Sequence, residues 1–170
     1  MPSELEILLE TFDPELHSQR LREWLLRPHV APWWGDPERA LRDVLRWSPD
    51  CRAVIVADGA PVGFACWERP GEERIEAAGL ADLPEDLIDI DVLIGEPEFM
   101  GRGVGPLALG LLLDRLRADP AVAVAGLGTS TSNVRAIRAF EKAGFRRVQE
   151  FQDPTIGLCT YMVVDVREAC

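Results

Sequence analysis

The sequence has few of the residues that build metal centres. Its 170 residues include two histidines and four cysteines (Cys51, Cys66, Cys159 and Cys170), and the cysteines lack the close spacing of zinc ligands. No apolar run approaches the roughly 20 residues that cross a membrane. The N-terminal residues also lack the basic and apolar regions of a secretory signal. We therefore expect no metal, no membrane contact, and free thiols in a reducing cytoplasm.

Basic residues are also scarce. Against 29 acidic residues there are 18 lysines and arginines, so the net charge is −11. Binding the phosphates of nucleic acid requires a basic surface, and the charge balance therefore argues against a nucleic-acid partner. An acidic cleft would instead attract a small cationic substrate such as an amino sugar. A solvated acidic surface without a ligand explains the same charge, and this alternative stays open.

Length and hydropathy patterning predict one α/β domain over residues 1–170. A chain of this length buries a full core, and 47% apolar residues is ordinary for a globular protein. The periodicities predict the order βααβββαβαββ, a mixed sheet flanked by helices, with a long acidic connection over residues 68–85. Expected strands cover residues 4–12, 52–57, 62–67, 87–94, 121–127, 145–151 and 158–166. Expected helices cover residues 14–26, 37–47 and 107–116 and a segment that begins at Asn133.

A glycine-rich turn, Phe99-Met100-Gly101-Arg102-Gly103-Val104-Gly105-Pro106, joins an expected strand to an expected helix. Glycines let consecutive backbone N–H groups turn inward, and the helix start adds the positive end of its dipole. Pro106 suits the first helical turn, where its missing N–H costs nothing. The pattern therefore predicts an anion site for a phosphate. It has neither the Lys-Ser/Thr of a P-loop nor the glycine spacing of the dinucleotide fingerprint, and a tight turn without a ligand is the alternative.

A second segment makes the prediction more specific. Residues 132–145, SNVRAIRAFEKAGF, follow an expected strand at a suitable distance after the glycine turn. Together the two segments resemble the acetyl-coenzyme A half of the GNAT N-acetyltransferases, over residues 87–166. The resemblance implies central strands that splay around acetyl-coenzyme A, with backbone N–H groups near Leu93 and Ile94 binding the pantetheine and thioester. It also implies cofactor contacts at Met100, Gly101, Arg102, Gly103, Val104, Gly105, Pro106, Asn133, Arg138 and Phe140.

The N-terminal third extends the resemblance to one branch of that family. The elements His29-Val30-Ala31-Pro32-Trp33-Trp34-Gly35, Ile90-Asp91 and Tyr161-Met162-Val163 resemble those of aminoglycoside 6′-N-acetyltransferases and siderophore hydroxamate acyltransferases. This implies direct transfer of acetyl to a primary amine in a ternary complex, which for an aminoglycoside confers antibiotic resistance. A siderophore-type N-acyltransferase and a coenzyme A-binding fold without catalysis are the alternatives. Members of the fold often pair through terminal strands, so a homodimer stays open.

The expected amine site centres on Asp91. A carboxylate just upstream of the cofactor turn can bind the substrate ammonium and accept its proton. Asp89 lies on the same face of the strand, so the two carboxylates form a pair in which like charge raises one pKa. The polar side of a half-buried strand is the alternative. Further substrate contacts are expected from Trp33, Trp34, Trp67, Glu68 and Asp153, with packing in the core as the alternative for the tryptophans.

Three positions depart from the family pattern. Met100 stands where relatives have arginine or glutamine, and Phe140 stands where most have a tyrosine proposed to protonate the leaving thiolate. Because Phe140 donates no proton, water or another group must serve, or the thiolate leaves unprotonated. Gly128 replaces an aspartate of the aminoglycoside enzymes, which leaves the position of the acetylated amine open. The role of His29, structural or substrate-binding, is open as well.

Overall fold

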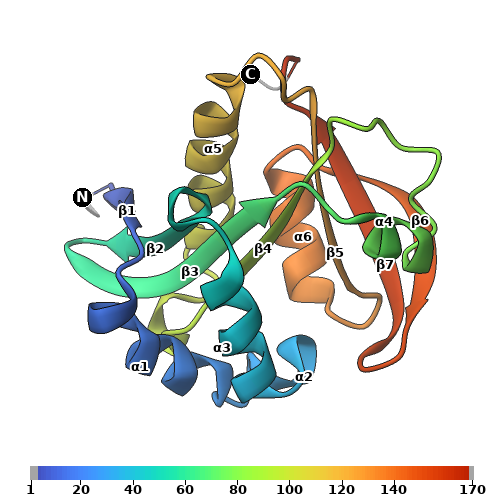
Figure 1. The fold of residues 1–170 in the computed structure, drawn as a ribbon. Helices are drawn as coiled ribbons and strands as arrows, with labels where there is room; N and C mark the ends of the chain where they lie inside the picture. The colour runs from blue at the N-terminus through green and yellow to red at the C-terminus, as the bar shows by residue number, and fades with distance from the viewer. Residues whose placement is uncertain (1–3, 169–170) are drawn as a thin grey trace.

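A mixed, helix-flanked sheet organises the described part of the chain, residues 4–168, in this computed structural model (Figure 1). The seven strands lie in the order β1-β2-β3-β4-β5-β7-β6, and β4 and β5 are the parallel neighbours. The strands are β1 (Ile7–Thr11), β2 (Arg52–Ala57), β3 (Ala60–Glu68), β4 (Ile88–Ile94), β5 (Val124–Ser130), β6 (Arg146–Asp153) and β7 (Gly157–Asp165). The helices are α1 (Pro14–Leu25), α2 (Ala31–Trp34), α3 (Pro37–Arg46), α4 (Glu72–Ala77), α5 (Val104–Arg117) and α6 (Val134–Lys142), with 3₁₀ turns η1 (Pro49–Cys51) and η2 (Pro97–Phe99). The predicted fold class is confirmed.

Local sequence explains where the N-terminal helices begin. Asp13 precedes the proline that opens α1 and accepts a hydrogen bond from the backbone N–H of Glu15 at 2.9 Å. Asp36 has the same place before α3 and accepts from the N–H of Arg39 at 2.7 Å. An aspartate cap followed by proline satisfies one free N–H and removes another. Both helices therefore begin where the sequence predicts.

Helices cover both faces of the sheet. On one face, α1 and α3 pack Leu21 and Val44 against Phe64 of β3. On the other, α5 and α6 contribute Leu112 and Ile137 to the largest apolar cluster. Figure 1 shows α1 and α3 in front of the sheet and α5 behind it. Among residues 4–168, no helix is both long and apolar enough to cross a membrane.

The central strands part soon after they pair. β4 pairs with β5 at two positions, Ile88 with Ala125 and Asp89 with Gly126. β4 then continues to Ile94 along β3 alone. From Ile90 onward, the edge of β4 that faces β5 is open. The splay that the family resemblance implies is therefore confirmed.

Two short helices replace parts of the chain that were expected to be loops. α2 follows His29 and contains both tryptophans of the Trp33-Trp34 pair. α4 lies within the expected acidic connection, and its six residues are too few for a periodicity to reveal it. Tertiary contacts hold this segment in place, because the Gln149 side-chain amide donates to the carbonyl oxygens of Ala78 and Gly79, each at 2.7 Å. The helix matters for the site because its residue Arg74 reaches the cavity described below.

Candidate active site

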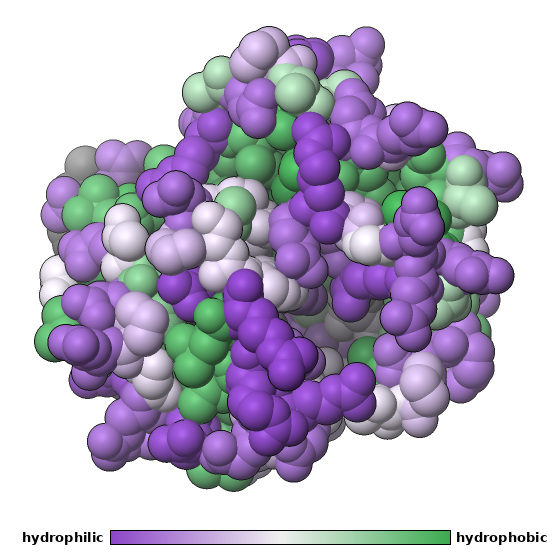
Figure 2. Space-filling view, in the orientation of Figure 1, coloured by the Kyte–Doolittle hydropathy of each residue, from purple (hydrophilic) through white to green (hydrophobic). Residues whose placement is uncertain are grey.

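A cavity of about 1180 Å³ opens where β4 and β5 part. On one side it is lined by the glycine turn and by the beginnings of α5 and α6. On the other it is lined by α2, α3, α4 and the turn between β6 and β7. Figure 2 shows the hollow that this cavity makes on the face between the N-terminal helices and α4. The cavity therefore connects the two faces of the sheet through the gap between its central strands.

The glycine turn has the backbone geometry of an anion site. Gly101 and Gly103 adopt φ values of 73° and 84°, a left-handed region that disfavours other residues. Gly103 is the N-cap residue of α5, so the free N–H groups of the first helical turn lie beside it. Gly101, Gly103, Gly105 and Pro106 line the cavity, together with Met100 and Val104. Arg102 does not line it, and its guanidinium lies 4.9 Å from the centre of the Phe99 ring.

Cations gather on the same side of the cavity. Arg135, Arg138 and Lys142 of α6 all contribute to its lining. A guanidinium nitrogen of Arg135 lies 3.5 Å from the sulfur of Met100, so this helix reaches the glycine turn. In a chain of net charge −11, three cations at one entrance create a local site for anions. The arrangement suits a ligand with several phosphates, and the sequence singled out only Arg138 of the three.

Asn133 connects the end of β5 to the start of α6. Its side-chain oxygen accepts the N–H of Ala136 at 3.3 Å and caps the helix. Its amide nitrogen donates to the hydroxyl of Thr129 at 3.1 Å. Both Asn133 and Thr129 line the cavity. The side chain that the sequence assigns to cofactor binding therefore also builds the wall on which the cofactor would rest.

The open edge of β4 offers backbone donors to the cavity. Gly95 donates its N–H to the carbonyl of Val62 in β3 at 2.8 Å, and the register of the two strands is regular. Since successive N–H groups of a strand point to opposite sides, the N–H of Leu93 also points toward β3. The N–H groups of Val92 and Ile94 point toward the gap. The free N–H groups on this edge are therefore those of Ile94 and Val92 and not that of Leu93, and their binding of the cofactor stays a prediction.

The end of β4 is braced by α1 and by the loop that follows it. The His29 ring nitrogen Nε2 lies 2.9 Å from the carbonyl oxygen of Ile94, so this histidine contacts the end of β4 while it also lines the cavity. The indole N–H of Trp24 donates to Glu96 at 2.9 Å, and Arg27 lies 3.5 Å from the same carboxylate. A Cβ at Gly95 would overlap the Trp24 ring, so only glycine fits there. These contacts hold the donors of β4 in position.

The two expected carboxylates have different surroundings. Asp91 is half-buried and lines the cavity. Burial raises the pKa of Asp91, and the nearby guanidinium of Arg74 opposes this rise. Asp89 does not line the cavity: its side chain lies 2.7 Å from Arg74 and accepts the hydroxyl of Tyr161 at 2.9 Å. The structure therefore places Asp91 where a substrate amine can meet it and encloses Asp89 behind it.

Some of the other residues expected to contact the substrate line the cavity and some do not. Trp33 and Trp34 line the cavity and are half-buried. Trp67 does not line it, because its side chain is 5% exposed and packs in the core beneath the guanidinium of Arg115. Glu68 is half-buried at the end of β3 and is also absent from the lining. Asp153 lines the cavity from the turn between β6 and β7.

Sequence reasoning missed two residues of this side. Arg74 and Tyr161 both line the cavity and both contact Asp89. Arg74 lies in the acidic connection and Tyr161 on the last strand. Neither has neighbours in the sequence that indicate a common site. Their meeting depends on where α4 lies and on the pairing of β7 beside β5 in the sheet.

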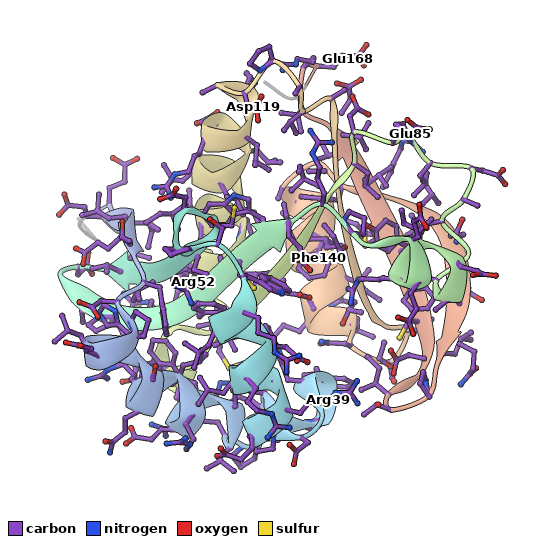
Figure 3. All side chains as sticks on the ribbon, viewed as in Figure 1. Arg39, Arg52, Glu85, Asp119, Phe140 and Glu168 are labelled. Carbon is purple, nitrogen blue, oxygen red and sulfur yellow. The ribbon has the colours of Figure 1, made fainter. Side chains whose placement is uncertain are left out.

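Phenylalanine rings occupy the space at two of the three positions that depart from the family pattern, Phe140 and Gly128. Phe140 is 7% exposed, lines the cavity and packs against Phe145 with ring centres 6.4 Å apart. Figure 3 shows it on α6 in the middle of the molecule. At Gly128, an added Cβ would lie 3.3 Å from the ring of Phe151. A longer side chain at this position therefore requires that Phe151 move.

Comparison with known proteins gives a family for this architecture. Residues 13–153 match the acetyltransferase (GNAT) domain family. The chain is 32% identical over 159 residues to an aminoglycoside N(6′)-acetyltransferase type 1 of Klebsiella pneumoniae, covering 84% of this chain and 75% of the relative. It is 38% identical over 74 residues to a kanamycin resistance protein of Rhizobium radiobacter, covering 44% of this chain and 68% of the relative. A solved structure of the aminoglycoside acetyltransferase AAC(6′)-Ib with coenzyme A and kanamycin superposes with a TM-score of 0.72 at 28% identity, covering 95% of each chain.

The family match includes both sides of the cavity. It begins at the cap of α1 and ends at the last residue of β6. Within these limits lie the glycine turn, the open edge of β4 and the carboxylate of Asp91. The chain belongs to the GNAT family of acetyltransferases.

Proposed function

We propose that this protein transfers the acetyl group of acetyl-coenzyme A to a primary amine of an aminoglycoside or a related amino sugar. The observation that carries the proposal is the single cavity that joins the anion site of the glycine turn to Asp91 across the sheet. The relative of Klebsiella pneumoniae is an aminoglycoside acetyltransferase, and the solved relative holds coenzyme A and kanamycin. Acetylation of such an antibiotic confers resistance on the cell that makes the enzyme.

The cofactor fits the side of the cavity that carries positive charge. The start of α5 and the cations of α6 would hold its phosphates. Its pantetheine arm would lie along the open edge of β4, where the backbone of Val92 and Ile94 supplies hydrogen bonds. This places the thioester in the gap between β4 and β5, next to the amine side.

The amine approaches the thioester from the opposite side of the sheet. Asp91 binds the ammonium and accepts one proton from it, and the neutral amine attacks the thioester carbonyl. The free N–H groups on the edge of β4 stabilise the negative charge that develops on the carbonyl oxygen. The C–N bond forms and the C–S bond breaks, and the sulfur leaves with the electron pair. Phe140 donates no proton, so we assign protonation of the thiolate to water, while nitrogen releases its second proton to solvent.

Rings and one further carboxylate make up the rest of the proposed amine site. Trp33 and Trp34 offer apolar surface on which a sugar ring can stack. Asp153 accepts the backbone N–H groups of Thr155 and Ile156 at 2.7 and 3.0 Å, both on its Oδ1 atom. This fixes the carboxylate and leaves Oδ2 for an ammonium group of the substrate. Trp67, Glu68 and Asp89 are not part of this site.

We also propose a cytoplasmic location, because acetyl-coenzyme A is consumed inside the cell. Cys51, Cys66 and Cys159 are free thiols, in agreement with a reducing compartment, and Cys170 lies outside the described residues. An aminoglycoside reaches its target in that compartment, so this is where acetylation would protect the cell.

A coenzyme A-binding protein without catalysis is the second candidate function. The observation that favours it is Phe140, which places a buried ring where most relatives have a hydroxyl group. The intact glycine turn agrees equally well with this candidate. The two functions therefore differ in one measurable property, which is turnover.

The test is thiol release from acetyl-coenzyme A in the presence of a panel of amines. The panel contains aminoglycosides, other amino sugars, polyamines and hydroxylysine. We expect turnover with aminoglycosides and a loss of about 10²- to 10⁴-fold in kcat for Asp91→Asn, with coenzyme A binding retained. Asp82→Asn, an exposed position in the same acidic connection as α4, is the matched control. Tight coenzyme A binding with no turnover of any amine would favour the non-catalytic function.

A further inference from the structure

One arginine joins α4 to the buried carboxylate of β4. The Nε atom of Arg74 lies 2.7 Å from Oδ2 of Asp89, and the hydroxyl of Tyr161 donates to Oδ1 at 2.9 Å. The Asp89 side chain is 4% exposed, whereas that of Arg74 is 52% exposed and lines the cavity. The inner carboxylate is therefore fully partnered, and a guanidinium stands at the wall of the amine site.

Several parts of the fold are adapted to this contact. A Cβ at Gly126 would overlap the hydroxyl of Tyr161, so a glycine leaves the space through which the hydroxyl reaches Asp89. The amide of Gln149 in β6 holds the residues just after α4 through the carbonyls of Ala78 and Gly79. These contacts fix the position of Arg74 from two directions. The network thus links β4, β7 and the segment that carries α4.

The same guanidinium acts on Asp91. Asp89 and Asp91 lie two residues apart on one face of β4. The attraction of Arg74 lowers the pKa of Asp91, against the larger effect of burial. Burial and the like charge of Asp91 already raise the pKa of Asp89 to about 7, against the attraction of Arg74. Without the cation the pKa values of both carboxylates would rise further, and the pair would keep a shared proton to higher pH. A neutral Asp91 can neither bind an ammonium ion nor accept its proton.

Other titratable groups also surround Asp91. Glu68 and Cys66 of β3 interact electrostatically with it, and burial raises the pKa of both. Tyr161 faces it from β7, where burial and Asp89 raise the pKa of the hydroxyl above its ordinary range. On α3, Arg39 and Asp43 line the same cavity as an ion pair at 3.8 Å. Arg74 is the cation whose attraction opposes the rise at Asp91.

We propose that Arg74 is a positioning residue for acetyl transfer: paired with Asp89, whose other carboxylate oxygen accepts from Tyr161, it offsets the charge of Asp89 and so keeps Asp91 ready to take the proton of the substrate amine. This role rests on the proposed function, since Asp91 is its proton acceptor. It also explains why a buried carboxylate and an arginine occur beside a site for cations. The arginine is bound to the inner acid, and the outer acid is left for the substrate.

The test compares the pH dependence of kcat/KM in three variants with the wild type. Arg74→Gln removes the cation, and we expect the acidic limb of the profile to move up by about 1 pH unit. Asp89→Asn removes the like charge and frees the guanidinium, so the limb moves down. The double variant removes one charge of each sign and returns the limb close to its wild-type position. Arg69→Gln is the control, because Arg69 holds the same segment through the carbonyls of Glu85 and Ala121 without contacting a carboxylate.

A measurement without substrate separates this role from the proposed function. Carbon-13 NMR of the carboxyl group follows the titration of Asp91 in the free enzyme, with the same expected directions of shift. If no amine is acetylated, the proposed function fails while the NMR titration still shows whether Arg74 controls Asp91. The proposal is overturned if Arg74→Gln leaves the titration midpoint of Asp91 where Arg69→Gln leaves it. It is also overturned if Arg74→Gln and Asp89→Asn shift the midpoint in the same direction.

Discussion

At residue scale, the surroundings of Asp89 and Asp91 separate two side chains of identical chemistry. Both project from one face of β4, as the period of a strand requires. Arg74 and Tyr161 enclose the first, whereas the second borders the cavity. A carboxylate held by two donors is suited to a structural role, whereas one that a substrate can approach is suited to the role of base that we propose for Asp91. The difference in role therefore comes from neighbours that are distant in sequence.

Asp91→Asn is expected to stabilise the protein although it lowers activity. Because burial raises the pKa of Asp91 above its ordinary value of 3.8, the folded protein holds this proton more tightly than the unfolded chain. The charged carboxylate therefore lowers the free energy of unfolding as the pH rises above about 4. Asparagine removes that cost. We expect Tm to rise by a few degrees at neutral pH and to match the wild type near pH 3, as measured by calorimetry at both pH values. A lower Tm at neutral pH would contradict this account.

Gly126→Ala is expected to weaken the fold, because its Cβ would overlap the hydroxyl of Tyr161. Overpacking of this kind costs about 1–3 kcal/mol in the free energy of unfolding. Gly110→Ala is the matched control: it lies inside α5 with nothing within 4 Å of the added carbon. There alanine should gain about 0.5–1 kcal/mol through helix propensity. Denaturant unfolding of the two variants measures both changes, and equal effects would show that Tyr161 yields without cost.

At element scale, the glycine turn and α5 form one unit with the geometry of an anion site, where we place the phosphates of the cofactor. The turn needs positive φ at Gly101 and Gly103, and α5 begins at once after the second of these. The sequence placed this helix from residue 107, whereas the structure starts it at Val104. Glycine and proline in the first turn hide the helical pattern, because both are poor helix formers in isolation. The helix start is therefore closer to the anion site than the apolar periodicity indicated.

Gly103→Ala is expected to impair binding of acetyl-coenzyme A. Its Cβ meets nothing within 4 Å, so the whole effect comes from a φ of 84°. Holding alanine in this region costs about 1–2 kcal/mol, and relaxation of the turn would raise the Kd for coenzyme A by about 5- to 30-fold. Gly71→Ala is the control: an added Cβ there also meets nothing within 4 Å, but the φ of −69° suits alanine, so coenzyme A binding should be unchanged. Calorimetric titration with coenzyme A compares the two, and similar affinities would remove the conformational argument.

At the scale of the whole molecule, charge is distributed unevenly. The net charge is −11, yet Arg135, Arg138 and Lys142 border the cavity on the cofactor side. In the proposed reaction the two substrates carry opposite charges and approach from opposite faces of the sheet. The acidic surface would attract the cationic aminoglycoside, and the local group of cations would receive the phosphates of acetyl-coenzyme A.

Added salt should therefore lower kcat/KM for a polycationic amine. Raising the ionic strength from about 0.02 M to about 0.5 M shortens the screening length several-fold, and we expect kcat/KM for an aminoglycoside to fall by about 10-fold. A monoamine that is accepted as substrate should lose far less. Steady-state rates at saturating acetyl-coenzyme A give this comparison. An equal loss for both amines would mean that the overall charge does not steer the substrate.

Much of the fold was readable from local sequence. Alternating apolar residues marked the strands, aspartate and proline marked the starts of α1 and α3, and glycines marked the anion turn. These signals are local because they depend on the covalent preferences of neighbouring residues. Asp91, Asn133 and the glycine turn, apart from Arg102, all line the cavity, and their roles in binding and catalysis stay predictions.

Only the tertiary structure decided how these elements share one site. It put Trp67 in the core, enclosed Asp89, and assigned Val92 the free donor expected of Leu93. It also brought Arg74 from a short helix to the wall of the cavity. Whether a side chain is buried or borders the cavity depends on the packing of segments that are distant in sequence, and a local sequence pattern does not contain that information. The sequence by itself determined which reactive and anion-binding groups the protein has. The parting of β4 from β5 decided which of these groups border the cavity.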